Sequence, residues 1–225
     1  MAINKEAYQQ IISELAPRDI TLVAVSKTKP VSDIKALYDL GHRDFGENYV
    51  QELVEKQVAL PADIRWHYIG HLQSNKVKYI APFVHLIHGV DSLKLLLEID
   101  KQARKNNRVI NCLLQVHIAQ EETKFGFSDA ELWEIMEDVH KSKLMDQLKN
   151  VEIAGLMGMA SLTDDMEQAR KEFKLLKLFF NQCAEQQVQN TIKILSMGMS
   201  SDYQVAIEEG STMVRIGSLV FGSRP

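Results

Sequence analysis

Residues 21–47 read TLVAVSKTKPVSDIKALYDLGHRDFGE and contain one complete strand–helix–strand unit. The run 21–26 is short, apolar and partly β-branched, as is typical of a buried strand. Residues 33–40 form a helical segment that Gly41 ends. A second short strand follows at 44–47. This rhythm predicts parallel strands that are joined by right-handed helical crossovers.

The same pattern recurs along the whole chain. Strands are expected at 21–26, 44–47, 65–69, 86–90, 111–118, 151–157, 192–196 and 213–216. Helices are expected at 5–15, 33–40, 49–60, 74–79, 93–105, 130–149, 166–185 and 203–209. Eight strands, of which the first seven are each followed by a helix, favour a single (β/α)8 TIM-type barrel with an extra N-terminal helix. The alternative is an open doubly wound sheet, although no Gly-x-Gly-x-x-Gly motif follows an early strand.

Composition places the chain among ordinary globular proteins and excludes several functions. Of 225 residues, 45% are hydrophobic and 25% are charged, and no linker divides them, so residues 1–225 are expected to form one domain. The net charge of -4 argues against nucleic-acid binding. The polar N-terminus and the absence of a long apolar run predict a soluble, cytoplasmic protein that does not enter membranes. Cys112 and Cys183 lack the spacing of a disulfide framework or a zinc site.

The active site of such a barrel lies where the carboxyl ends of the strands meet. Lys27 directly follows the first strand, so burial is expected to lower the pKa of its amine. A neutral amine attacks an aldehyde to form a Schiff base. The alternative is a lysine at the barrel mouth that pairs with a loop carboxylate. Position alone does not separate these two interpretations.

A second polar cluster follows the seventh and eighth strands. Ser200, Gly217 and Ser218 lie where barrels of this type often bind phosphate through loop amides and hydroxyl groups. The alternative is that Ser200 caps a helix and that Gly217 makes a turn. The cluster therefore predicts an anion site only in combination with the barrel.

Arg215 interrupts an apolar strand, and arginine is rarely buried without a partner. It either pairs with a carboxylate such as Glu47 inside the barrel or faces a ligand. Four methionines near strand ends are expected as pocket walls: Met157, Met159, Met197 and Met199. Five histidines lack a recognised metal-ligand spacing, so structural roles and no metal site are expected: His67, His71, His85, His88 and His117.

Several segments resemble those of the pyridoxal phosphate homeostasis proteins, which are similar in fold to the N-terminal barrel of alanine racemase. These segments are 23–30 (VAVSKTKP), 45–52 (FGENYVQE), 66–76 (WHYIGHLQSNK), 155–157 (GLM), 196–200 (SMGMS) and 210–217 (GSTMVRIG). The resemblance implies that Lys27 carries pyridoxal 5'-phosphate as a Schiff base and that Arg215 faces its pyridine nitrogen. It implies phosphate contacts from Ser200, Gly217 and Ser218, with Asn48 lining the pocket. The chain ends soon after residue 216, whereas some relatives are expected to have a longer closing helix.

The resemblance implies a carrier or regulator of vitamin B6 without catalytic residues, with pyridoxal-phosphate-dependent apoenzymes as candidate partners. We expect the protein to be a monomer. The alternative is an amino-acid racemase of low activity. Two-base racemisation needs a second acid/base group, which the full-length racemase takes from another domain, and no residues are left here to build that domain. An arginine at the ring nitrogen also disfavours electron-sink chemistry. A barrel that only binds other proteins is a third possibility, and it predicts no affinity for the aldehyde.

Overall fold

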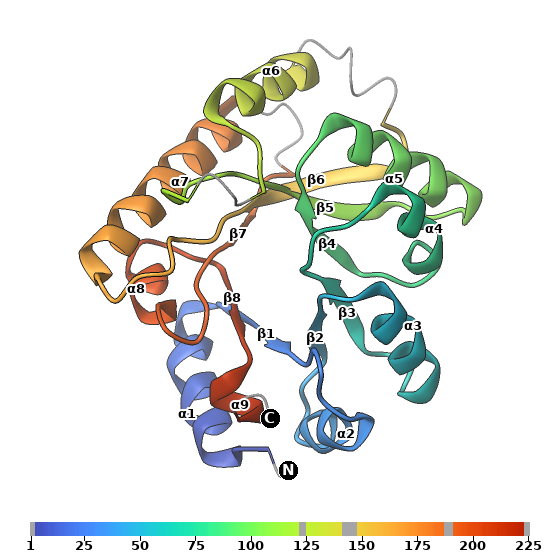
Figure 1. Cartoon of the computed structure of the whole chain (residues 1–225), viewed down its shortest axis with the longest axis vertical. Helices are drawn as coiled ribbons and strands as arrows, with labels where there is room; N and C mark the ends of the chain where they lie inside the picture. The colour runs from blue at the N-terminus through green and yellow to red at the C-terminus, as the bar shows by residue number, and fades with distance from the viewer. Residues whose placement is uncertain (1–2, 122–124, 141–147, 187–190, 223–225) are drawn as a thin grey trace.

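The computed structural model describes residues 3–121, 125–140, 148–186 and 191–222, and it forms a closed barrel of eight parallel strands (Figure 1). The strands are β1 (Thr21–Val25), β2 (Asp44–Glu47), β3 (Arg65–Tyr68), β4 (Leu86–Val90), β5 (Ile110–Gln115), β6 (Val151–Met157), β7 (Ile194–Ser196) and β8 (Met213–Ile216). Each strand pairs with the next, and β8 closes on β1 from the pair Thr21–Met213 to the pair Ala24–Ile216. The predicted (β/α)8 barrel is confirmed, and the open sheet is excluded.

The helices lie outside the ring of strands (Figure 1). They are α1 (Lys5–Leu15), α2 (Val31–Asp39), α3 (Val50–Ala59), α4 (Val77–Ile80), α5 (Leu93–Lys105), α6 (Asp129–His140), α7 (Met166–Gln186), α8 (Tyr203–Glu208) and α9 (Ser218–Phe221), with 3-10 turns at Ala16–Arg18 and Ser74–Lys76. None of the helices in the described part of the chain combines the length and the apolar content needed to cross a bilayer.

Two predicted boundaries are wrong because contacts with residues elsewhere in the chain set them. The helix expected at 130–149 does not include residues 148 and 149, because the backbone N–H of the next residue, Asn150, donates to Asp100 of α5 at 2.6 Å and leads into β6. Residues 141–147 of that prediction lie outside the described residues. The strand expected to reach 118 ends at Gln115, because the chain then pairs with the loop at Phe127.

The two ends of the described chain pack together outside the ring of strands, at the bottom of the view in Figure 1. Asn4 caps α1 by accepting from the backbone N–H of Ala7 at 3.1 Å. Its own backbone N–H donates to the carbonyl of Val220 in α9 at 2.8 Å. Helix α9 was not predicted, because its four residues are too few to show a helical period.

The strands alternate between two environments, as their pleat requires. In β1, Leu22 and Ala24 join the large apolar core beneath the helices, whereas Val23 joins a smaller apolar cluster inside the ring. The inside also holds buried polar side chains from five strands: Asp44, His67, His88, Ser196 and Arg215. Buried polar groups need hydrogen-bond partners, so the inside of this barrel must contain a polar network.

Candidate functional site

A cavity opens at the carboxyl ends of the strands. Its volume of about 460 Å³ is within the range of roughly 300–1,000 Å³ that is usual for small-molecule sites. Residues in or directly after β1, β2, β3, β6, β7 and β8 form its wall. The structure brings all six predicted site residues to this wall: Lys27, Asn48, Ser200, Arg215, Gly217 and Ser218.

Lys27 is half-buried in the loop directly after β1, and carboxylates accept hydrogen bonds from the residues on both sides of it. The hydroxyl of Ser26 donates to Glu47 Oε1 at 2.6 Å. The backbone N–H of Thr28 donates to Glu52 Oε1 at 2.6 Å. Thr28 has a φ of 63°, a left-handed conformation that costs a non-glycine residue about 1–2 kcal/mol. These hydrogen bonds offset that cost and fix the position of Lys27.

One ammonium group joins the two carboxylates. Lys56 of α3 is buried, and its Nζ donates to Glu47 Oε1 at 2.8 Å, to Glu52 Oε1 at 2.6 Å and to the carbonyl of Ser26 at 2.8 Å. Burial raises the pKa of Glu47, while Lys56 and the Ser26 hydroxyl oppose that rise. The sequence analysis missed this cluster, although the i,i+4 spacing of Glu52 and Lys56 is a visible signal for a pair.

A second lysine lines the same cavity. Lys29 is 8% exposed, and its Nζ donates to the carbonyl of Gly222 at 3.1 Å, which links the loop after β1 to the end of α9. Sequence reasoning missed this residue because a lysine is seldom buried so fully. Amine chemistry in the cavity therefore has two candidate groups, Lys27 and Lys29.

The wall between β7 and β8 is polar. The backbone N–H of Gly217 donates to Ser200 Oγ at 3.3 Å. A Cβ atom at Gly217 would lie 3.2 Å from the carbonyl oxygen of Val25, so this loop passes close to the end of β1. Ser200 does not cap the following helix, because the N-cap of α8 is Asp202. The helix-capping alternative for Ser200 is therefore wrong.

Arg215 extends from β8 to the cavity and is 4% exposed. Its Nη1 donates to the carbonyl and the hydroxyl of Ser196 at 2.8 and 2.7 Å, and its Nη2 donates to the carbonyl of Gly158 at 3.0 Å. The ion pair with Glu47 is not formed, because Glu47 is bonded to Lys56 instead. Burial lowers the pKa of Arg215 to about 10, so the guanidinium remains charged at neutral pH.

Asn48 contributes a buried oxygen atom to the site. Among the described residues, its Oδ1 has no hydrogen-bond partner. Its backbone is held firmly, since its carbonyl accepts from the hydroxyl of Tyr68 at 2.9 Å and passes close to Gly70. A buried amide oxygen without a partner costs about 1–3 kcal/mol. A ligand with a donor group at this position would remove that cost.

The remaining sequence candidates are divided between the cavity and the core. Met159 and Met199 line the cavity, whereas Met157 and Met197 are buried in the core. Within the described ranges, no group of three or more histidine, cysteine or acidic side chains is arranged to hold a metal ion.

Comparison with known proteins adds family relationships to this geometry. The family model described as the alanine racemase N-terminal domain matches residues 5–225. The pyridoxal phosphate homeostasis protein of Aquifex aeolicus is 42% identical over 90% of this chain and 86% of its own length. That of Synechocystis is 40% identical over 98% of this chain and 99% of its own length. PipY from Synechococcus elongatus is 35% identical in sequence, and the match covers 96% of this chain and 99% of PipY. The structure of PipY with pyridoxal phosphate bound superposes on this one with a TM-score of 0.85.

Proposed function

The chain belongs to the pyridoxal phosphate homeostasis proteins, whose barrel is that of the alanine racemase N-terminal domain, and from this premise we propose that it binds pyridoxal 5'-phosphate as a Schiff base on Lys27. The observation that carries the proposal is the meeting of six predicted residues in one cavity of suitable volume. Its physiological role is then that of a carrier or regulator in vitamin B6 homeostasis.

The chemistry of the donor set fits the cofactor. Bound pyridoxal phosphate supplies an aldehyde, which condenses with the Lys27 amine and releases one water molecule. Ser200, Gly217 and Ser218 offer hydroxyl and backbone N–H groups to the phosphate. The unpartnered Oδ1 of Asn48 would accept a hydrogen bond from the bound molecule.

Arg215 determines what the bound cofactor does. A guanidinium only donates hydrogen bonds and keeps its proton, so an arginine at the pyridine nitrogen leaves that nitrogen unprotonated. An unprotonated ring is a poor electron sink, which opposes racemase and related chemistry. We therefore propose that the protein has no catalytic residues. We also propose that residues 1–225 form one monomeric domain, that the protein is cytoplasmic, and that it passes the cofactor to apoenzymes.

Absorbance spectroscopy tests this function. The purified protein, incubated with pyridoxal phosphate, should show a visible band that borohydride bleaches, and peptide mass mapping should place the reduced cofactor on Lys27. Lys27→Ala should abolish the reducible adduct, and Lys29→Ala serves as the matched control because it removes the other cavity lysine. A reduced adduct on Lys29 would overturn the assignment of Lys27.

The same preparation tests the role. A protein that takes up no pyridoxal phosphate would overturn the whole proposal. Racemisation of alanine by the loaded protein, lost in Lys27→Ala, would establish the racemase alternative. Transfer of the cofactor to an apoenzyme faster than the cofactor dissociates into buffer would support the carrier role.

A further inference from the structure

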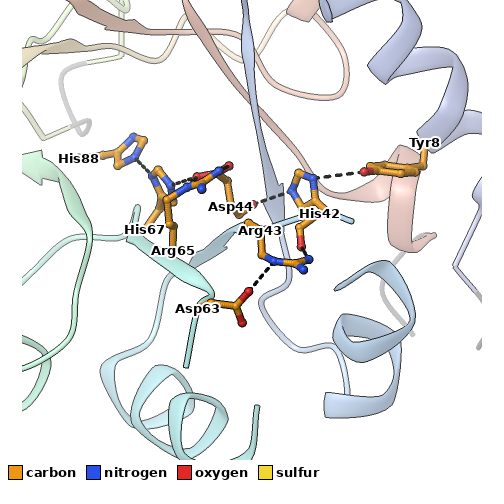
Figure 2. Close-up of polar contacts among 8 residues, drawn as sticks. All are labelled: Tyr8, His42, Arg43, Asp44, Asp63, Arg65, His67 and His88. Atoms are coloured by element: carbon orange, nitrogen blue, oxygen red, sulfur yellow. Dashed lines mark hydrogen bonds and ion pairs between the residues drawn. The ribbon is translucent and has the colours of Figure 1, made fainter. Parts of the chain in front are cut away.

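A continuous hydrogen-bonded row crosses the inside of the barrel below the cavity. It begins where β2 and β3 begin, with the carboxylate of Asp44 and the half-exposed guanidinium of Arg65, whose Nε donates to Asp44 Oδ1 at 2.7 Å. Asp44 Oδ1 also lies 3.0 Å from His67 Nε2, and His67 Nδ1 lies 3.0 Å from His88 Nε2. Figure 2 shows these four side chains as one group, with His88 at one end and Asp44 at the other.

The row continues to the cavity. His88 Nδ1 lies 3.1 Å from Ser196 Oγ, which accepts from Arg215 Nη1 at 2.7 Å. The two histidines and Ser196 are at most 1% exposed. We call Asp44, His67, His88 and Ser196 the interior relay. It links the amino-terminal end of the barrel, where Arg65 meets solvent, to the guanidinium at the cavity wall.

When both imidazoles are neutral, the two ends of the interior relay determine every proton in it. A carboxylate only accepts, so His67 Nε2 must donate to Asp44. A neutral imidazole has one donor and one acceptor, so His67 Nδ1 accepts from His88 Nε2. His88 Nδ1 then accepts from the hydroxyl of Ser196. That hydroxyl oxygen is left to accept from Arg215, which is the contact that the structure shows.

Electrostatics agrees with this direction. Burial lowers the pKa of His88 well below its usual value, and positive charge on its neighbours His67 and Arg215 acts in the same sense, so His88 is neutral. Burial raises the pKa of Asp44, but hydrogen bonds from His67 and Arg65 outweigh it and lower the pKa of that carboxyl overall. Asp44 is therefore a carboxylate and can act as the fixed acceptor at the end.

We propose that the interior relay positions Arg215. Each group in the relay donates a hydrogen bond toward Asp44, and the guanidinium is thereby held with its remaining N–H groups toward the cavity. Arg215 forms three hydrogen bonds, to Ser196 and Gly158, and the described residues accept no others from it. The assignment of the ring nitrogen as the group that they meet rests on the proposed function.

Two measurements test the interior relay. Long-range proton–nitrogen NMR of the unaltered protein without cofactor, with resonances assigned by His67→Gln and His88→Gln, should show both imidazoles neutral and protonated at Nε2. An imidazolium, or protonation at Nδ1 in either ring, would overturn the proposed direction. This outcome does not depend on the cofactor, so it separates a failure of the relay from a failure of the proposed function.

The second measurement compares Ser196→Ala with Ser211→Ala in the loaded protein. Both serines are buried, but the hydroxyl of Ser211 lies within hydrogen-bond distance of backbone carbonyls, those of Leu195, Met197 and Met213, and of no side chain in the described part of the chain. Ser196→Ala should shift the visible band of the bound cofactor while the reduced adduct still maps to Lys27, whereas Ser211→Ala should leave the band in place.

Equal spectra for both variants and the parent protein would overturn the positioning role. A band that moves equally in both variants would show a general loosening of the barrel, and it would also overturn the proposal. The absence of a Lys27 adduct in the parent protein would refute the proposed function, and the NMR result would then decide the relay alone.

Discussion

Replacing Lys56 by methionine should destabilise the protein strongly and in a pH-dependent manner. The substitution keeps the approximate length of the side chain but removes the ammonium that Glu47 accepts from. Glu47 is 0% exposed, so its charge is left in the interior with the Ser26 hydroxyl as its remaining hydrogen-bond partner among the described residues. Removing one partner of a buried ion pair typically costs about 3–5 kcal/mol. We expect a loss of that size above neutral pH.

The sign of the pH dependence follows from Glu47. Burial already raises its pKa in the folded protein, and loss of Lys56 removes the main opposing charge. In the folded variant Glu47 therefore binds a proton at a higher pH than it does in the unfolded chain, where its pKa is 4.5. The destabilisation is complete above the raised pKa and becomes smaller as pH falls through it. Glu47→Gln added to Lys56→Met should recover most of the loss, because no buried charge remains.

Urea denaturation at pH 8 and pH 5.5 measures these free energies of unfolding through the midpoint and slope of the transition. Lys35→Met is the matched control, because Lys35 forms an i,i+4 pair with Asp39 in which both side chains are about half exposed. It should leave the midpoint almost unchanged. A loss below about 1 kcal/mol for Lys56→Met, or a loss that Glu47→Gln does not reduce, would refute the reasoning.

Three further results are expected. Burial lowers the pKa of His42 from 6.5 to about 4, so the unfolded chain takes up a proton at a higher pH than the folded protein does. About 3 kcal/mol of stability should therefore be lost as pH falls from 6.5 to 4. Urea denaturation of the parent protein and of His42→Gln measures this loss. Gly155→Ala should prevent folding, as judged by circular dichroism, because the new Cβ would lie 1.8 Å from a backbone oxygen of β7. In Gly41→Ala the new Cβ would have no atom within 4 Å. That variant should lose only about 1–2 kcal/mol of stability, because alanine must adopt a left-handed backbone conformation there. Cys112 and Cys183 are fully buried, and burial raises the pKa of both thiols, that of Cys183 to about 12. Neither cysteine should therefore react with a thiol reagent until urea unfolds the protein.

The barrel was predictable because its strands are buried on both faces. The segment 21–26 is apolar almost throughout, which a strand covered by helices requires, and Gly41 marks the end of the helix that follows. The boundaries that failed depend on contacts between distant residues. The start of β6 is set by the carboxylate of Asp100, fifty residues earlier in the chain, and no local pattern near Asn150 reveals it.

The site was predictable only in part. Lys27 and Arg215 are conspicuous because each is a charged residue beside or within an apolar strand. Lys56 is not conspicuous, because on a helix it resembles any solvated lysine, and only the fold shows that it is 5% exposed. The same holds for His67 and His88, which look like unrelated strand residues until barrel closure places them 3.0 Å apart.

The barrel has two cores, and this division explains the role of the buried polar residues that the sequence did not reveal. The apolar layer between strands and helices, which includes Leu22 and Ala24, supplies hydrophobic burial without any help from the polar interior. The interior is therefore free to hold Asp44, His67 and Ser196, which contribute little hydrophobic stabilisation and need one another as hydrogen-bond partners. Substitutions in the outer layer should change stability and leave the cavity intact, whereas substitutions in the interior relay should alter the cavity through Arg215. A barrel that used its interior only for apolar packing would not show this separation.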